Sequence, residues 1–138
     1  MAIQQGATDA FATGLMNGVY NFTTDSFKIA LYTGAASLGP DTAVYTVANE
    51  VVATGYTAGG IALTVSVAPT SANNTAYISF TNVTWNAALT ASGALIYKSG
   101  GTNPTVCVLD FGGEKISTAT FTIQFPTANS SDAIIRIT

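Results

Sequence analysis

The stretch Phe27-Lys28-Ile29-Ala30-Leu31-Tyr32 shows the pattern on which most of this chain is built. Large apolar side chains stand at every second position, and this period of two is typical of a half-buried β-strand. The same alternation returns near the other end, where Phe121, Ile123 and Phe125 are separated by Thr and Gln. The pattern therefore predicts a mainly β protein.

Similar segments recur at spacings of about ten residues, with turn residues between them, as in sandwiches and barrels. Asn73-Asn74 lies in a predicted hairpin turn, and Gly112-Gly113 is expected to end the apolar strand before it. We expect one domain over residues 1–138, an antiparallel β-sandwich or a jelly-roll-like barrel. Its predicted strands are 27–32, 44–47, 50–52, 61–67 (ending near Pro69), 77–80, 82–85, 93–97, 105–111 (a central strand), 121–125 and 133–137.

Residues 1–24 differ from the rest and are predicted to form an N-terminal arm with one short helix. The helix is expected over 8–19, with Thr8 or Asp9 as its N-cap. Phe11, Leu15 and Val19 recur every four residues and give it one apolar face. Glycines inside this segment lower its intrinsic helix stability, so the helix should depend on packing.

Charge is scarce: 8% of the 138 residues are charged and the net charge is −3, whereas a soluble domain usually carries about 25% charged residues. Four scattered basic residues cannot form the basic stripe that nucleic-acid binding needs. No stretch approaches the roughly 18 apolar residues of a membrane span, and the N-terminus does not resemble a signal peptide. We therefore expect a protein made in the cytoplasm, with neither nucleic acid nor membrane as a partner.

The chain has few residues suited to catalysis, because it contains no histidine and only one cysteine. Ser-His-Asp and Cys-His arrangements and Cys/His zinc sites are thereby excluded. Cys107 lies in an apolar run and is expected to be a buried thiol. Asp110 and Glu114, which flank Gly112-Gly113, are a weak signal for a cation such as calcium. We predict no catalytic, cofactor-binding or metal-binding residues and no enzyme activity.

The aromatic residues Trp85, Tyr56, Tyr77 and Tyr97 allow two interpretations. Side chains of this kind most often pack in a core or at its rim. They also form the platforms on which sugars stack, and nothing in their spacing places all four on one face.

Several segments resemble a family of small virion proteins of tailed phages and prophages. The residues that carry the resemblance are FKIALYTG (27–34), GYTAGG (55–60), VTWN (83–86), GALIYKSG (93–100), VLDFGGEKIST (108–118), FTIQFP (121–126) and AIIRI (133–137). The resemblance implies a capsid decoration or cement protein on the outer surface of the virion. It implies the major capsid protein as partner and self-association, with a trimer favoured, and it carries over no catalytic residue.

A marginal helix and a polar arm are segments that gain order when they dock on a neighbour. The candidate partner-interface residues are therefore Phe11, Leu15, Val19, Tyr20 and Phe22. The alternative function is a binding module for a host glycan, in a phage tail fibre or baseplate or in a secreted protein. It rests on the aromatic residues and on a neutral surface rich in hydroxyl groups.

Overall fold

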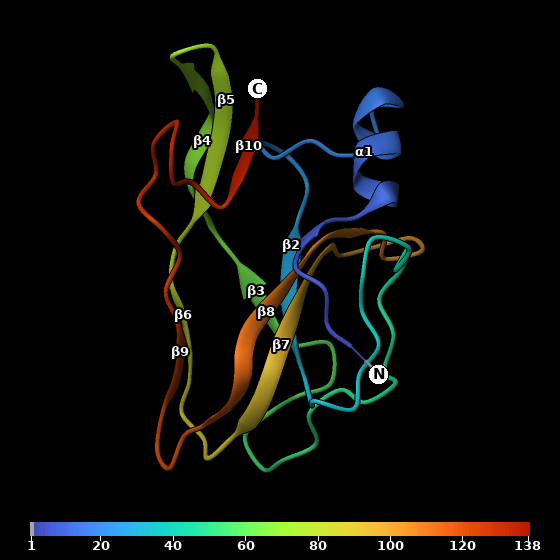
Figure 1. The fold of residues 1–138 in the computed structure, drawn as a ribbon, viewed down its shortest axis with the longest axis vertical. Coiled ribbons are helices and arrows are strands. Elements are labelled where there is room, and N and C mark those ends of the chain that lie inside the picture. The colour runs from blue at the N-terminus through green and yellow to red at the C-terminus, as the bar shows by residue number, and fades with distance from the viewer. Residues whose placement is uncertain (1) are drawn as a thin grey trace.

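The computed structural model describes residues 2–138 and shows antiparallel sheets packed face to face (Figure 1). The larger sheet has five strands, and its central strand β7 pairs with β2 on one side and β8 on the other. Its order is β1 (Gly6–Ala7), β8 (Thr105–Ile116), β7 (Thr90–Lys98), β2 (Phe27–Tyr32) and β3 (Ile61–Leu63).

The opposite layer consists of a three-stranded and a two-stranded sheet. Strands β3 and β4 are separated by Thr64 alone, so the chain passes there from one layer to the other. The three-stranded sheet has the order β10 (Ile135–Ile137), β5 (Thr75–Phe80) and β4 (Val65–Ala72), and the two-stranded sheet pairs β6 (Val83–Trp85) with β9 (Phe121–Ile123).

Apolar side chains from both layers fill the space between them. Phe27, Ile29 and Leu31 of β2 point into this core, as the alternation in the sequence predicts, and meet side chains of β5 and β6 such as Phe80 and Trp85. The mainly β, sandwich-like fold with one short helix is thus confirmed. Residues 2–138 form no closed barrel.

Strand β2 is buried on both faces, which differs from the half-buried strand that its sequence predicts. Ala30 and Tyr32 lie on the outer face of the large sheet, yet neither is exposed to solvent. They belong to a second apolar cluster that includes Ala36 and Leu38 from the loop after β2. The loop of residues 33–60, which we call the covering loop, therefore covers this outer face with its first part, through Tyr45. Further along the loop, Val51 and Tyr56 pack in the core between the two layers.

Helix α1 (Asp9–Met16) is shorter than the predicted 8–19. Thr8 is its N-cap, and its hydroxyl oxygen accepts a hydrogen bond from the backbone of Phe11 at 3.2 Å. The helix ends at Asn17, and Gly18 takes a positive φ of 71° that turns the chain away. Val19 consequently lies beyond the helix and does not extend its apolar face.

Four details of the predicted strands are wrong. Segments 44–47 and 50–52 form only single bridges, from Val44 to Pro104 and from Glu50 to Tyr32, because they belong to the covering loop. Strand β4 runs through Pro69, which is tolerated because β4 is an edge strand. Strand β8 likewise continues through Gly112-Gly113, which form a bulge opposite β7. It is not central, since only the two-residue β1 lies outside it.

The single strand predicted over 61–67 is also wrong, because the chain changes layer at Thr64 and forms β3 and β4 in different sheets. Strand 27–32 has the predicted bounds, the other predicted strands are present with shifted ends, and β1 has no counterpart in the prediction. The hairpin turn at Asn73-Asn74 is confirmed, with positive φ angles of 52° and 64° between β4 and β5. Positive φ at both central positions is the geometry of a tight hairpin turn, and Asn tolerates it well.

Substitution of Gly60, the last residue before β3, tests how closely the covering loop approaches the backbone of β2. A Cβ atom there would lie 1.8 Å from the carbonyl oxygen of Ile29, and the φ of +84° disfavours any side chain. We expect Gly60→Ala to lower the free energy of unfolding by about 3 kcal/mol or more, measured by urea denaturation. Gly101→Ala is the matched control: its φ is +60° but no described atom lies within 4 Å, so a loss of about 1 kcal/mol is expected. Equal losses in the two variants would contradict the close approach.

Candidate functional site: a braced loop and an apolar groove

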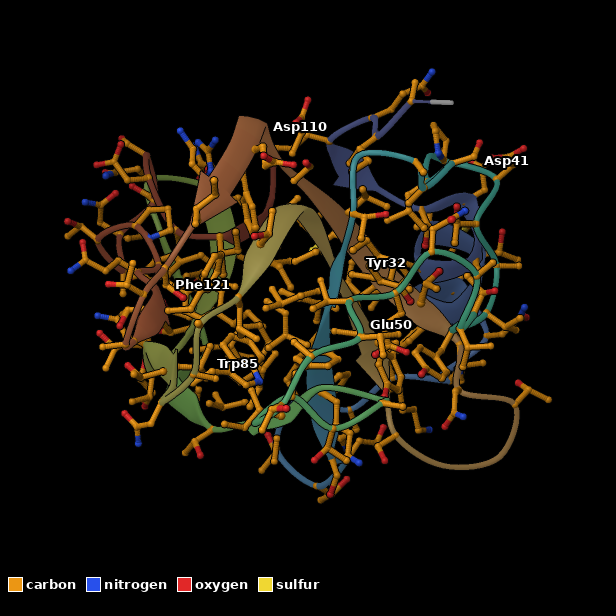
Figure 2. The ribbon with its side chains drawn as sticks, turned by 90° about the horizontal axis from the view of Figure 1, so that it is seen from below. Tyr32, Asp41, Glu50, Trp85, Asp110 and Phe121 are labelled. Carbon is orange, nitrogen blue, oxygen red and sulfur yellow. The ribbon has the colours of Figure 1, made fainter. Side chains whose placement is uncertain are left out.

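A buried carboxylate holds the covering loop in place. Glu50 is 6% exposed and accepts hydrogen bonds from the hydroxyl groups of Tyr45 and Tyr56, at 2.5 and 2.6 Å. The backbone N–H of Gly59 donates a third, at 2.8 Å. Figure 2 shows Glu50 near Tyr32. Three donors that converge on one carboxylate stabilise its charge without a cation.

Tyrosine side chains fasten the same loop to the large sheet. From the sheet, the hydroxyl group of Tyr32 donates to the carbonyl oxygen of Thr46 and that of Tyr97 to the carbonyl oxygen of Gly59, both at 2.6 Å. The ring of Tyr45 stacks on that of Tyr97, with centroids 4.7 Å apart. From the loop, the hydroxyl oxygen of Tyr56 accepts a bond from the backbone of Leu31 at 2.9 Å. Loop and sheet therefore share one hydrogen-bond network, which we call the Glu50 brace (Glu50 with Tyr32, Tyr45, Tyr56 and Tyr97).

Burial raises the pKa of each of these tyrosines above its ordinary value of 10.0. The negative charge of Glu50 raises the pKa values further, because it disfavours a second negative charge beside it. The phenol groups therefore stay neutral and act as hydrogen-bond donors. Every buried side-chain nitrogen or oxygen in residues 2–138 has a hydrogen-bond partner. The Glu50 brace is thus a structural element whose polar groups are already engaged.

The braced loop presents apolar side chains to solvent. Val44, Val47 and Val52 are 46%, 67% and 97% exposed. No charged side chain is exposed between residues 42 and 60, because Glu50 is buried and the segment has no other charged residue. Loops of this length without regular structure are uncommon in compact domains and usually have a function. The uncharged surface of residues 42–60 is therefore one candidate site.

The second candidate is a groove of about 870 Å³ between α1, the edge formed by β1 and β8, and the strand β10. We call it the β10 groove. Apolar side chains dominate it, and Arg136 is its one charged residue. It is lined by Gln5, Gly6, Ala7, Phe11, Ala12, Leu15, Met16, Val106, Cys107, Val108, Leu109 and residues 133–138.

The five predicted interface residues do not share an exposed face. Phe11 and Tyr20 are buried, with ring centroids 5.0 Å apart, and the hydroxyl group of Tyr20 donates to the carbonyl oxygen of Thr105 at 2.6 Å. Phe22 is partly buried against Phe27. Leu15 is partly buried, and Val19 is 39% exposed. The role of the five residues in binding a partner stays a prediction. In this structure Phe11 and Tyr20 pack in the core.

The remaining candidates from the sequence have structural roles. Cys107 is buried, which raises the pKa of its thiol to about 12 and keeps it protonated. Asp110 accepts a hydrogen bond from the backbone of Gly112 in the bulge of β8. No group of three or more potential metal ligands occurs in residues 2–138. The acids near Gly112-Gly113 therefore form no such cluster with other ligand side chains.

Trp85, Tyr56 and Tyr97 are 5%, 9% and 3% exposed, which agrees with their interpretation as core residues. Tyr77 is half-buried. These four residues therefore form no exposed stacking platform. Glu50 was not among the predicted site residues, and its signal in the sequence is a lone acid between small residues and the apolar pair Val51-Val52.

Comparisons with models of protein families, with curated proteins and with solved structures found no match to this chain. In the part of the chain that the structure describes, no helix has the length and apolar character needed to cross a membrane.

Replacing the acceptor tests the Glu50 brace. In Glu50→Gln the new amide group brings hydrogen-bond donors to a place where three donors already converge. We expect the free energy of unfolding to fall by about 2–3 kcal/mol, measured by urea denaturation. Glu114→Gln, which alters an exposed acid, should change it by less than about 0.5 kcal/mol. Equal free energies of unfolding for the two variants would show that the Glu50 brace does not stabilise the fold.

Alkaline pH tests the tyrosines. Because their folded pKa values are raised above 10.0, folding favours the protonated phenols. Their contribution to stability is complete below pH 10 and decreases as the pH rises above it. We expect phenolate absorbance from these tyrosines to appear together with loss of the folded circular dichroism signal. Full titration of all tyrosines in a protein that remains folded would contradict this.

Proposed function

We propose that this chain is a non-enzymatic structural protein of a tailed-phage particle, a capsid cement or decoration protein. It binds the outer shell and stabilises contacts between major capsid proteins. The observation that carries the proposal is the braced loop, which presents exposed valines in a segment that has no exposed charge of its own. The resemblance in the sequence supplies the identity of the partner.

A clamp between neighbouring subunits works best when its binding surface is formed in advance. Ordering a flexible loop on binding consumes free energy that a rigid loop retains for the contact. The Glu50 brace and the tyrosine contacts hold residues 33–60 on the sheet before any partner arrives. Many weak contacts of this kind add up when many copies bind one particle.

The placement of charge agrees with this use of the loop. Asp110, Glu114 and Lys115 are all exposed in the half of β8 beyond its pairing with β1. Charges and bulges on an edge strand oppose pairing with other chains. Glu114 borders the loop surface, since it lines one hollow with Val52, and the neutral surface of residues 42–60 beyond it contacts the shell.

The proposal includes the other properties that the resemblance implies. The protein is made in the host cytoplasm and ends on the outer capsid surface, where it self-associates, with a trimer expected. Neither nucleic acid nor a membrane is a partner. The glycan-binding alternative, in a tail fibre or baseplate or in a secreted protein, has lost one of the two observations that motivated it, since Trp85, Tyr56 and Tyr97 are buried. It now rests on the neutral, hydroxyl-rich surface alone.

Particle composition tests the proposal. We expect purified particles to contain on the order of hundreds of copies of the chain, measured by quantitative mass spectrometry. Particles that lack the chain should release DNA at a lower temperature than complete ones, and adding the protein back should restore the original temperature. A handful of copies per particle, or unchanged thermal release, would contradict a cement role.

Substitutions in the loop test the binding surface. Val47→Asp and Val52→Asp each place a charge on an exposed position, so folding should persist while particle binding weakens about tenfold or more, equivalent to about 1.4 kcal/mol. Lys115→Gln is the control and should bind like the original chain, because Lys115 is exposed and borders a different hollow, lined by residues within 111–124. Because the surface is neutral, binding should change little between low and high salt. A steep fall with added salt would show that charged residues carry the contact.

A further inference from the structure

We propose that the β10 groove binds an extended segment of a partner protein, which adds as a strand to the free edge of β10 and places a carboxylate opposite Arg136. The inference concerns a different surface from the loop and does not depend on the particle.

The groove follows the edge of β10. Every residue from 133 to 138 borders it, and residues Val106–Leu109 of β8, which are already paired with β1 and β7, lie across from them. Successive side chains of a strand point to opposite faces of the sheet, so a hollow bordered by all residues of β10 lies along the edge of that strand. In residues 2–138, β10 pairs with β5 on one side and has no partner strand on the other. Its outward backbone groups are therefore available to an added strand.

The size of the groove suits a short strand. Within packed sheets, one residue occupies about 160 Å³, from a rise of about 3.3 Å, a strand spacing of about 4.8 Å and a sheet spacing of about 10 Å. A volume of about 870 Å³ thus holds about five residues. A segment of this length matches the span of β10 with its flanking residues.

The lining defines the chemistry of the segment. Leu15, Val108 and Ile135 require apolar side chains on the face turned inward. Met16 lies at the rim, is 83% exposed and has a flexible side chain that adapts to different partners. Arg136 is exposed and makes no ion pair within residues 2–138. A carboxylate on the bound segment would complement this single charge.

The free edges of β8 and β10 differ in how they are protected. The distal half of β8 combines a glycine bulge with Glu114 and Lys115, which are features that prevent strand pairing. Strand β10 has no bulge in its register with β5 and carries only Arg136. The edge of β8 therefore opposes pairing with another strand. The edge of β10 lies beside an apolar groove and carries one charge that can select an acidic partner.

A selection from random twelve-residue peptides displayed on phage tests the proposal with the intact protein as bait. We expect enriched peptides that alternate apolar residues and contain Asp or Glu. Selection on Arg136→Glu should instead enrich Lys or Arg at the corresponding position. No enrichment, or the same acidic peptides with both baits, would overturn the proposal.

A peptide from that selection then serves as the probe for the binding mode. Ala12→Trp fills the groove from an exposed helix position and should weaken binding at least tenfold. Thr13→Trp is exposed on the same helix outside the groove and should leave binding unchanged. Hydrogen exchange should slow at the backbone amides of Ile135–Ile137 when the peptide binds. Unchanged exchange there, or equal effects of the two tryptophan variants, would refute strand addition.

Self-association is the competing occupant of the groove. If a second copy fills it, the original chain should dimerise or oligomerise in analytical ultracentrifugation, and Ala12→Trp should abolish that association. This outcome would show that a second copy occupies the groove and would overturn the proposal that a segment of another protein binds there. A sedimentation profile that Ala12→Trp leaves unchanged, together with peptide binding that it removes, supports the proposal.

Discussion

The buried carboxylate of Glu50 is the group on which the shape of the covering loop depends. Its hydrogen bonds join Tyr45, Tyr56 and Gly59 within the loop, while other bonds, such as those from Tyr32 to Thr46 and from Tyr97 to Gly59, fasten the loop to the large sheet. A loop held in this way keeps the second apolar cluster, which includes Ala30, Leu95 and Val108, away from water. A buried carboxylate without a cation is stable only when strong donors surround it, and here two phenols and one backbone N–H do so. The same three bonds keep the loop rigid, and rigidity makes its exposed valines useful as a binding surface.

The few charged side chains of this protein lie at distinct places in the fold. Few charged side chains are present, so the place of each one shapes the surface around it. The acid of the loop is buried, which leaves residues 42–60 neutral, whereas β8 carries charges along an open edge and β10 carries a single arginine beside an apolar groove. The protein thus has a neutral surface at residues 42–60, an edge at β8 that opposes strand pairing, and an edge at β10 that favours an acidic partner. The proposed contact with a shell and the proposed strand-binding groove use different parts of it.

Sequence reasoning succeeded where local pattern and burial agree. Strand β9 alternates buried and exposed side chains as its sequence does, and the Asn73-Asn74 turn follows from the backbone preference of asparagine. It failed where a distant segment decides the outcome. Pro69 ends no strand because β4 lies at an edge, and Gly112-Gly113 form a bulge because β7 continues beside them. The candidate interface failed to emerge as one surface for the same reason, since Phe11 and Tyr20 pack under residues far away in the sequence.

The sequence by itself determined the β class, the capped N-terminal helix, the tight hairpin turn and the neutral character of the surface. Each of these depends on neighbouring residues or on composition, so that local chemistry suffices. Only the tertiary structure decided that residues 33–60 form a covering loop instead of two strands, that Glu50 is buried among tyrosines, and that β10 borders a groove. Those features arise from contacts between residues separated by tens of positions, and no local pattern specifies which distant donor will meet a carboxylate or which strand edge will remain unpaired.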